Sequence, residues 1–389
     1  MNTGRTIFAQ LTDLLPLAEF RRCVDRYDGD YKVQSFSCLD QLLCLVYAQL
    51  SYRESLRDIE TCLRAHQPQL YHMGFRGRIA RNTLAHANEQ RDWRIYADFA
   101  RILIAQARSL YQHEPFGVAL DETVYAFDST TVDLCLSLFP WAQFRRRKSA
   151  VKIHTLLDLR GPIPTSVYVT GGQVNDVKLL DQLEVEAGAF YLLDRGYVDF
   201  RRLYALRQAC AFFVTRAERN TRYRRCARRW VDRSTGLRSD QTIRLTGPKS
   251  SRRYPDPLRR IHYFDAEKDL RLIFLTNNFH LAALTIAMLY RARWQVELFF
   301  RRIKQHLHIR AFYGTSENAV KTQVWTAITT YVLVAILKKQ LPVNLSLYKI
   351  LQILSTMIFE KTPISLAFSN YNNRIPQPDP CIQLDLFNL

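Results

Sequence analysis

Four polar residues recur at helical spacing near residue 300. Tyr290 is followed by Arg293 three positions on, by Glu297 four positions later and by Lys304 after seven more. At about 100° per residue, a helix would place all four within roughly 60° on one face. The flanking positions are mostly apolar: Trp294, Val296, Leu298, Phe299 and Ile303. A solvated, ion-paired helix would have polar neighbours, so the pattern favours a polar stripe that lines a cleft, with Trp294 used for packing.

Two aspartates stand where apolar runs end. Asp128 follows Val-Tyr-Ala-Phe, and Asp194 follows Phe-Tyr-Leu-Leu and precedes Arg-Gly. An aspartate in such a place is more often a turn or cap residue than a functional one. Four other aspartates compete for the same interpretation: Asp133, Asp158, Asp176 and Asp199. Position alone therefore does not select the two.

The elements that must carry these residues change in character along the chain. Residues 1 to about 112 read as short helices with glycine turns, which is compatible with a helix-turn-helix module. The middle holds short β-branched or aromatic segments at 124–132, 151–159, 165–172, 190–197 and 210–216, with helices between the later ones. That order indicates an α/β fold. Long helices are expected over about 281–308 and 319–339, and a shorter one near 345–354.

The net charge is the feature of the composition that most narrows the choice of binding partner. The 389 residues carry 55 Lys and Arg against 36 Asp and Glu, a net charge of +19, of which +14 falls within 201–260. A one-signed run is usually solvated surface, but this one is arginine-rich and interleaved with aromatics, which suits phosphates and stacked bases. The candidates are Arg216, Arg222, Arg224, Arg225, Arg228, Arg229 and Trp230. No amphipathic apolar face accompanies them, so nucleic acid is favoured over a membrane.

The cysteines and one polar helix give two further indications of function. The eight cysteines form no Cys-x-x-Cys pair, which disfavours a zinc site and indicates reduced thiols in the cytoplasm. In the helical region Asn82 is expected to open a helix that carries His86, Asn88 and Gln90, with Arg81 and other arginines nearby. These side chains suit contact with base edges and phosphates, although a packing helix with a basic rim has the same composition.

Together these motifs resemble one family. The pattern Tyr-x2-Arg-x3-Glu-x6-Lys is the signature of bacterial DDE transposases of the insertion-sequence-four group, and Tyr290, Arg293, Glu297 and Lys304 match it without a gap. The text around Asp128 and Asp194 is similar to that group too. The resemblance covers nearly the whole chain.

The resemblance implies a fold and a chemistry. It implies a ribonuclease H-like core in which Asp128, Asp194 and Glu297 converge on two Mg²⁺ ions, with Mn²⁺ as a substitute. Carboxylates are the ligands that such hard cations prefer. It further implies that Tyr290, Arg293 and Lys304 contact phosphates near the cleavage point, and that cut-and-paste transposition proceeds through a DNA hairpin. Trp230 is then a candidate to stabilise a flipped base, or else an ordinary stacked surface residue.

The expected organisation has five parts. These are a helical DNA-binding region (1–112), the first part of the core (113–216), a basic β-rich insertion (217–270), the second part of the core with the catalytic helix (271–345), and a C-terminal helix and tail (346–389). The expected partners are the double-stranded DNA of transposon terminal inverted repeats and of the target, and a second copy of the chain in a synaptic dimer. A bacterial, nucleoid-associated location and no membrane are expected. The alternatives are a silenced or domesticated DNA-binding regulator, and a structure-selective nuclease on the same core.

Overall fold

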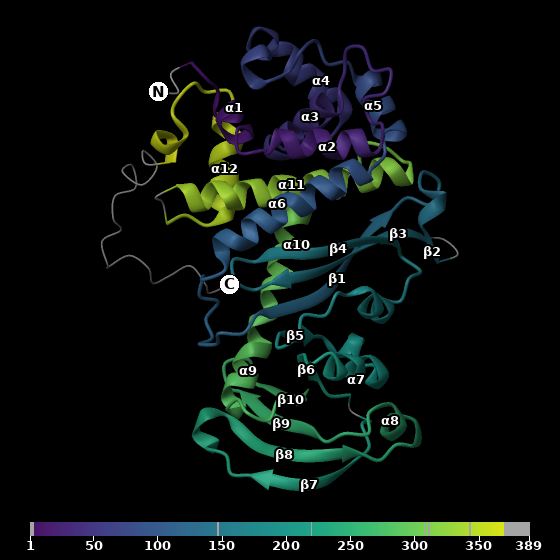
Figure 1. Cartoon of the computed structure of the whole chain (residues 1–389), viewed down its shortest axis with the longest axis vertical. Coiled ribbons are helices and arrows are strands. Elements are labelled where there is room, and N and C mark those ends of the chain that lie inside the picture. The colour runs from purple at the N-terminus through teal and green to yellow at the C-terminus, as the bar shows by residue number, and fades with distance from the viewer. Residues whose placement is uncertain are drawn as a thin grey trace, which may run out of the picture. The chain divides into compact units, whose positions relative to one another are not determined.

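The computed structural model describes residues 4–368, apart from 146–147, 219, 308, 310–311 and 342–343. The chain divides into two compact units, one formed by 1–103 with 303–389 and the other by 104–302. Figure 1 labels their helices and strands. The first unit is helical and the second is built around one sheet. The five-part division expected from the sequence remains a prediction.

Two long buried helices organise the helical unit. Nearly every residue of α3 (Cys38–Leu50) and most of α11 (Glu317–Gln340) are buried, and the two helices pack together. A capping box between Ser37 and Asp40 fixes the start of α3, because each side chain accepts a backbone N–H that the helix leaves unpaired. The remaining elements of this unit are α1 (Ile7–Thr12), α2 (Leu17–Arg26), α4 (Leu56–Ala65), η1 (Gln67–Gln69), η2 (Tyr71–Met73), α5 (Arg81–Gln90), the first part of α6 (Arg94–Tyr111) and α12 (Leu347–Met357).

The composition of α11 would allow it to span a membrane. It is 24 residues long with a mean hydropathy of 1.4 over its most apolar window, yet 94% of that window is buried within the protein. Its side chains contact α3, α5, α12 and α1. It is the core helix of this unit, and it confirms the long helix predicted over about 319–339. The helix predicted near 345–354 is also confirmed, as α12.

The second unit is one mixed sheet of ten strands. The first five are β1 (Val124–Leu134), β2 (Gln143–Arg145), β3 (Lys148–Asp158), β4 (Ile163–Gly171) and β5 (Phe190–Leu193). The other five are β6 (Phe212–Arg216), β7 (Tyr223–Arg229), β8 (Leu237–Leu245), β9 (Leu258–Asp265) and β10 (Leu270–Thr276). The mixed α/β class predicted from the order of elements is thereby confirmed.

The sheet order places β1 and β5 at the centre. The main path is β2-β3-β1-β5-β6-β10-β9-β8-β7, and β4 pairs with β3. Only β1–β5 and β5–β6 are parallel. All four residues of β5 are buried, as expected of a short parallel strand that is covered on both faces. The core around it includes Phe127, Tyr191, Leu203 and Phe213.

Helices and short 3₁₀ turns connect the strands. The helix α7 (Phe200–Gln208) joins β5 to β6, as expected, after the turn η5 (Arg195–Tyr197). The helix predicted from residue 176 is instead the 3₁₀ segment η4 (Asp176–Gln182), from which Leu179 and Leu180 reach the core. Apolar periodicity over so few residues does not separate the two kinds of helix. The remaining short elements are η3 (Pro140–Ala142), η6 (Arg233–Thr235) and α8 (Pro248–Arg253).

The long helix expected over 281–308 is two helices. They are α9 (Ala283–Ala292) and α10 (Trp294–His306), with Arg293 between them. The backbone N–H groups of Arg293 and Val296 donate to carbonyls three residues back, at 3.2 and 3.1 Å. Such tighter bonding interrupts the regular winding at Arg293.

Candidate active site at the carboxyl ends of the central strands

Sheet register brings the two predicted aspartates side by side. Phe127 of β1 pairs in parallel with Leu193 of β5, so Asp128 and Asp194 are the next residues on neighbouring strands. Parallel strands end at the same edge of a sheet. Residues that stand far apart in the sequence therefore lie side by side, at the end of a buried apolar run on each strand.

Two side chains from the α9–α10 segment reach these carboxylates. The Tyr290 hydroxyl donates to Asp194 Oδ1 at 3.1 Å. The Arg293 guanidinium donates through Nη1 to Asp128 Oδ2 at 2.9 Å and through Nη2 to Glu297 Oε1 at 2.7 Å. The two hydrogen-bonded groups meet where the Arg293 guanidinium lies over the Tyr290 ring, 5.7 Å from its centre. We call these five of the six residues predicted for the catalytic site the carboxylate cluster.

Burial dominates the electrostatics of the carboxylate cluster. It raises the pKa of Asp128 to about 6, although Arg293 and the Ser129 backbone N–H favour the ionised form. Burial also raises the pKa of the Tyr290 phenol, so this group stays protonated and able to donate. The side chain of Arg293 is 12% exposed, against 20% for Asp128 and 33% for Glu297. One guanidinium is therefore the main counter-charge for two carboxylates.

The oxygen atoms of the three carboxylates are of the type that a hard divalent cation binds. Three carboxylates supply only oxygen ligands, as Mg²⁺ and Mn²⁺ prefer. The Nε atom of Arg293 is buried without a hydrogen-bond partner, which shows that the guanidinium is incompletely matched to its surroundings. Among the described residues, no three His, Cys, Asp or Glu side chains stand close enough to hold one ion. The metal-ligand roles of Asp128, Asp194 and Glu297 stay predictions.

Lys304, the sixth predicted residue, lies on α10 in the part of the helix that belongs to the helical unit. Its side chain is half-buried. Its predicted phosphate contact stays a prediction.

The packing role predicted for Trp294 is wrong. Its side chain is 49% exposed at the first position of α10. Together with Arg216, Tyr290 and Arg293 it lines a pocket of about 240 Å³.

The competing aspartates have other partners. Asp158 accepts from Arg108, Asp176 accepts from Lys152 at 2.9 Å, and Asp199 caps α7 by accepting two backbone N–H groups. Asp133 is exposed on β1. Each of the first three is used within the fold, and none belongs to the carboxylate cluster.

The arginine tract forms the outer edge of the sheet. All seven residues of β7 are exposed, and they include Arg224, Arg225, Arg228 and Arg229. Within the described residues, no salt bridge involves these four; Arg229 donates to the Phe279 carbonyl instead. Trp230 follows the strand and is 87% exposed. Arg222 is exposed beside the strand, and Arg216 is half-buried at the end of β6.

A second basic cluster in the insertion was not predicted. Arg233, Arg238, His262 and Arg271 line a pocket of about 360 Å³ together with Phe264. Arg238 lies over the Phe264 ring, and Arg271 is paired in register with Phe264 on the neighbouring strand. We call this the β8–β10 pocket. The strand register assembles it from separate strands, so no local sequence motif could have revealed it.

Not every arginine of the tract is available for a ligand. Arg259 and Asp240 form an ion pair at 2.7 Å with side chains only 2% and 4% exposed. Arg259 also donates to the Leu281 carbonyl at 2.6 Å. This pair ties β8 and β9 to the segment that leads into α9, so its role is structural.

The candidate recognition helix α5 is only partly as predicted. Arg81, Asn82 and His86 are exposed along it. The helix begins at Arg81, and its N-cap is Ala80 without a side-chain hydrogen bond, so Asn82 does not open it. Asn88 is buried and accepts from Gln41 at 2.8 Å, which removes it from the candidates for base contact. DNA contact by the three exposed residues stays a prediction.

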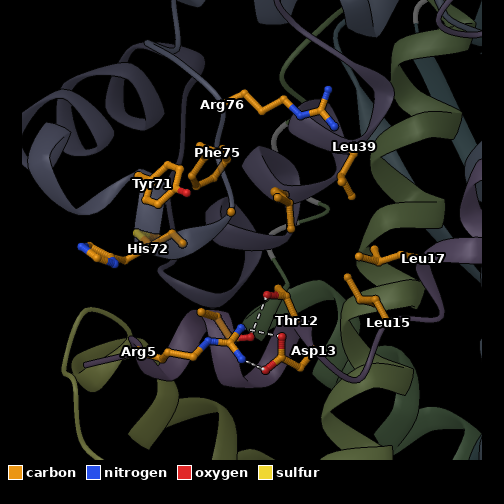
Figure 2. A pocket seen from close by; sticks show the side chains of 14 residues that line it. Arg5, Thr12, Asp13, Leu15, Leu17, Leu39, Tyr71, His72, Phe75 and Arg76 are labelled. Atoms are coloured by element: carbon orange, nitrogen blue, oxygen red, sulfur yellow. Dashed lines mark hydrogen bonds and ion pairs between the residues drawn. The ribbon is translucent and has the colours of Figure 1, made fainter. Parts of the chain in front are cut away.

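The helical unit also contains a large pocket. About 590 Å³ in volume, it has a largely apolar lining that includes Leu39, Phe75 and Met73. Figure 2 shows Arg5 paired with Asp13 on one side and Arg76 on the other. None of the predicted site residues lies in this pocket.

Comparisons with known proteins identify the family. The family "Transposase DDE domain" matches residues 119–333, and "Domain of unknown function (DUF4372)" matches residues 3–76. The chain is 32% identical over 286 residues to a putative transposase of Sinorhizobium fredii, covering 72% of this chain and 78% of that one.

Two further transposases and one structure are similar. The chain is 34% identical to a probable transposase for an insertion sequence of Geobacillus stearothermophilus, over 56% of this chain and 59% of that one. A putative transposase for an insertion sequence of Synechocystis is 23% identical, and the match covers 66% of this chain and 71% of that one. A cryo-EM structure of the piggyBac transposase synaptic complex with hairpin DNA has a TM-score of 0.48 and 11% identity to this chain. The match covers 97% of this chain and 87% of that one. On the family match and the first relative, this chain belongs to the DDE transposases, the DNA-transposition proteins of insertion sequences.

Proposed function

We propose that this chain cleaves the ends of an insertion sequence and joins them to target DNA, with Asp128, Asp194 and Glu297 as the catalytic carboxylates. One observation carries the proposal. Asp128 on β1, Asp194 directly after β5 and Glu297 on α10 share one cluster, in which Arg293 donates to Asp128 and Glu297 and Tyr290 donates to Asp194. The strand order β4-β3-β1-β5-β6, with its parallel β1–β5 pair, supports a ribonuclease H-like core around them.

Two Mg²⁺ ions, or Mn²⁺ in their place, would be held by the three carboxylates, and would activate the attacking oxygen and stabilise the leaving one. The chain's own residues position the DNA. Arg293 and Lys304 supply charge for phosphates at the cleavage point, and the Tyr290 hydroxyl holds Asp194 in place. Cleavage transfers the phosphorus from the 3′ oxygen to a water oxygen and leaves a 3′-hydroxyl. That hydroxyl then attacks the opposite strand, to close a hairpin, or the target DNA.

The basic surfaces would hold the DNA outside the cleft. The exposed arginines of β7 and those of the β8–β10 pocket have no carboxylate partner within the described residues, so their charge is available to a polyanion. Trp230 is exposed beside them and suits stacking on a base. On α5, Arg81, Asn82 and His86 would read the terminal repeat. Two ends brought together require a dimer, and the protein would act on bacterial DNA in the cytoplasm.

The test uses the DNA that flanks the gene. Purified protein is incubated with Mg²⁺ and a duplex that contains either flank, or a duplex of the same composition in scrambled order. Wild type is expected to cut the flank at one position and to leave the scrambled duplex intact. Asp128→Asn should bind the flank equally well and leave it uncut.

The other outcomes separate the alternatives. Specific binding without metal-dependent cleavage by wild type would indicate a DNA-binding regulator. Cleavage of branched DNA irrespective of the flanking sequence, with no joined product, would indicate a structure-selective nuclease. Equal cleavage by wild type and Asp128→Asn would remove this aspartate from the active site.

A further inference from the structure

The Arg293 guanidinium stands where a cation is needed. Its two terminal nitrogens bridge Asp128 in the middle of β1 and Glu297 on α10, at 2.9 and 2.7 Å. Two partly buried carboxylates without a counter-charge would repel each other more strongly than they would in water. Arg293 is therefore what keeps the carboxylate cluster stable without a bound ion.

This arrangement is incomplete. Within the described part of the chain no group accepts from the buried Nε of Arg293, and Asp194 receives its hydrogen bond from a neutral phenol rather than from a cation. Arg293 occupies one oxygen of Asp128 and one of Glu297, and these are oxygen atoms that a cation would need. The guanidinium therefore neutralises the carboxylate cluster only in part, because it contacts two of the three carboxylates.

The backbone and the surroundings allow Arg293 to leave. It occupies the interruption between α9 and α10, where hydrogen bonds run to carbonyls three residues back. The pocket of about 240 Å³ that Arg216, Tyr290 and Trp294 line begins beside it. Most of its lining is apolar, but it also contains the cations Arg216, Lys268 and Arg291, whose charge would attract a DNA phosphate. A guanidinium released from the carboxylates would meet that phosphate as its new counter-charge.

We propose that Arg293 is the resident substitute for the divalent cations: it neutralises Asp128 and Glu297 in the metal-free protein, and metal binding displaces it toward a DNA phosphate. The proposal rests on the proposed function, because it assumes that these carboxylates bind cations. It adds that metal binding and Arg293 compete for the same oxygen atoms. DNA contact by Arg293 is then coupled to the presence of metal, so the cleft gains phosphate affinity only when it is able to cut.

The first experiment measures metal affinity without DNA. Full-length wild type, Arg293→Gln and Arg293→Lys are titrated with Mn²⁺ by calorimetry, and Mn²⁺ binding is checked by electron paramagnetic resonance. Removing the competing charge should tighten Mn²⁺ binding of Arg293→Gln by about tenfold or more. Arg293→Lys, which keeps the charge but cannot bridge two carboxylates with a planar fork, should fall between the two.

A matched control lies two residues away. Arg291 is exposed and pairs with Glu267 rather than with the carboxylate cluster. Arg291→Gln removes the same charge from the same segment and should leave the Mn²⁺ affinity at the wild-type value. If Arg293→Gln unfolds without metal, recovery of its circular dichroism spectrum on adding Mn²⁺ measures the same competition. Mn²⁺ affinity of Arg293→Gln equal to or weaker than wild type would overturn the proposal.

The second experiment measures the coupling to DNA. Binding of end DNA by wild type and Arg293→Gln is compared in EDTA and in Ca²⁺, used as a divalent cation to limit cleavage. The two proteins should bind alike in EDTA and differ by about fivefold or more in Ca²⁺, since only then is Arg293 free for a phosphate. An equal loss of affinity in both buffers would contradict displacement.

These outcomes are distinct from failure of the proposed function. If wild type cuts DNA in a metal-dependent manner but Arg293→Gln gains no Mn²⁺ affinity, only the displacement is wrong. If wild type shows no Mn²⁺ binding that Asp128→Asn abolishes, the metal-binding role of the carboxylates is wrong.

Discussion

Arginine occurs in two opposite settings within the sheet-containing unit. Arg293 is almost fully buried and donates to two carboxylates in the cleft. The arginines of β7 are exposed on an edge strand, and none forms a salt bridge in the part of the chain that the structure describes. The arginine charge is thus neutralised by nearby carboxylates in the carboxylate cluster and has no carboxylate partner on β7 within the described residues.

The two settings give the arginine charge two different effects. A buried arginine paired with a carboxylate acts over a few ångströms, and salt screens this interaction little because it is buried. An uncompensated row adds to the field of the whole surface and attracts a polyanion at a distance, so its contribution depends strongly on salt. We therefore expect substitutions in the cleft to change the chemical step, and substitutions on β7 to change DNA affinity.

The largest expected effect is on the chemical step. Glu297→Gln keeps the shape of the side chain and removes one of the three carboxylates. Since metal-assisted charge stabilisation contributes several kcal/mol, cleavage of bound end DNA should slow about a thousandfold. Single-turnover cleavage at saturating DNA measures the rate, and a gel-shift titration should show unchanged affinity. A cleavage rate near that of wild type would remove Glu297 from the catalytic set.

The second prediction concerns the buried ion pair beneath β7. Asp240→Asn leaves the Arg259 charge buried without its partner, which costs about 3–5 kcal/mol in the free energy of unfolding. Chemical denaturation monitored by circular dichroism measures the loss. The control is the double variant Asp240→Leu with Arg259→Met, which removes both charges and should recover much of the stability. If the double variant is as unstable as the single one, the loss comes from altered packing and not from the unpaired charge.

The third prediction tests the uncompensated row. Replacing Arg224, Arg225 and Arg228 by Gln should weaken DNA binding and lower the slope of log affinity against log salt by about 2 to 3, because each phosphate that an arginine neutralises adds roughly 0.9 to that slope. The matched control is Arg202, Arg207 and Arg253, each replaced by Gln, because all three have carboxylate partners. An equal change of slope in both variants would mean that local pairing does not decide which arginines bind DNA.

The smallest expected effect is at the phenol. Tyr290→Phe removes the hydrogen bond to Asp194 and keeps the ring, so about 0.5–1.5 kcal/mol is lost. Cleavage should slow by up to about tenfold with the salt slope unchanged. A changed salt slope would place Tyr290 among the residues that set DNA affinity and not among those that orient a carboxylate.

Much of the carboxylate cluster could be predicted from the sequence. Asp128 and Asp194 end apolar runs that are strands, and Tyr290, Arg293 and Glu297 keep helical spacing although the helix is interrupted. A short 3₁₀ turn shifts later residues only slightly, so the apolar pattern does not reveal it.

Long-range pairing set the limits of that prediction. Trp294 has an apolar side chain, yet it is half exposed at the first position of α10. Asn88 is polar, but its burial follows from Gln41 on another helix. The β8–β10 pocket depends on strand register, which is a property of pairs of strands. For Asn88 and for this pocket, the deciding partner lies far away in the sequence.

The continuity of the sheet has a consequence for engineering this protein. The strands β7, β8 and β9 lie within the insertion predicted from the sequence, and they continue the sheet through β10 to β6. Excising them would leave β10 as a new border whose unpaired backbone groups run beside Ile273, Phe274 and Leu275. A bare apolar border of this kind recruits strands from other molecules, whereas the present arginine-rich border repels its own copies. We therefore expect a version without the insertion to aggregate during expression, so the same strands that offer charge to DNA also keep the protein monodisperse.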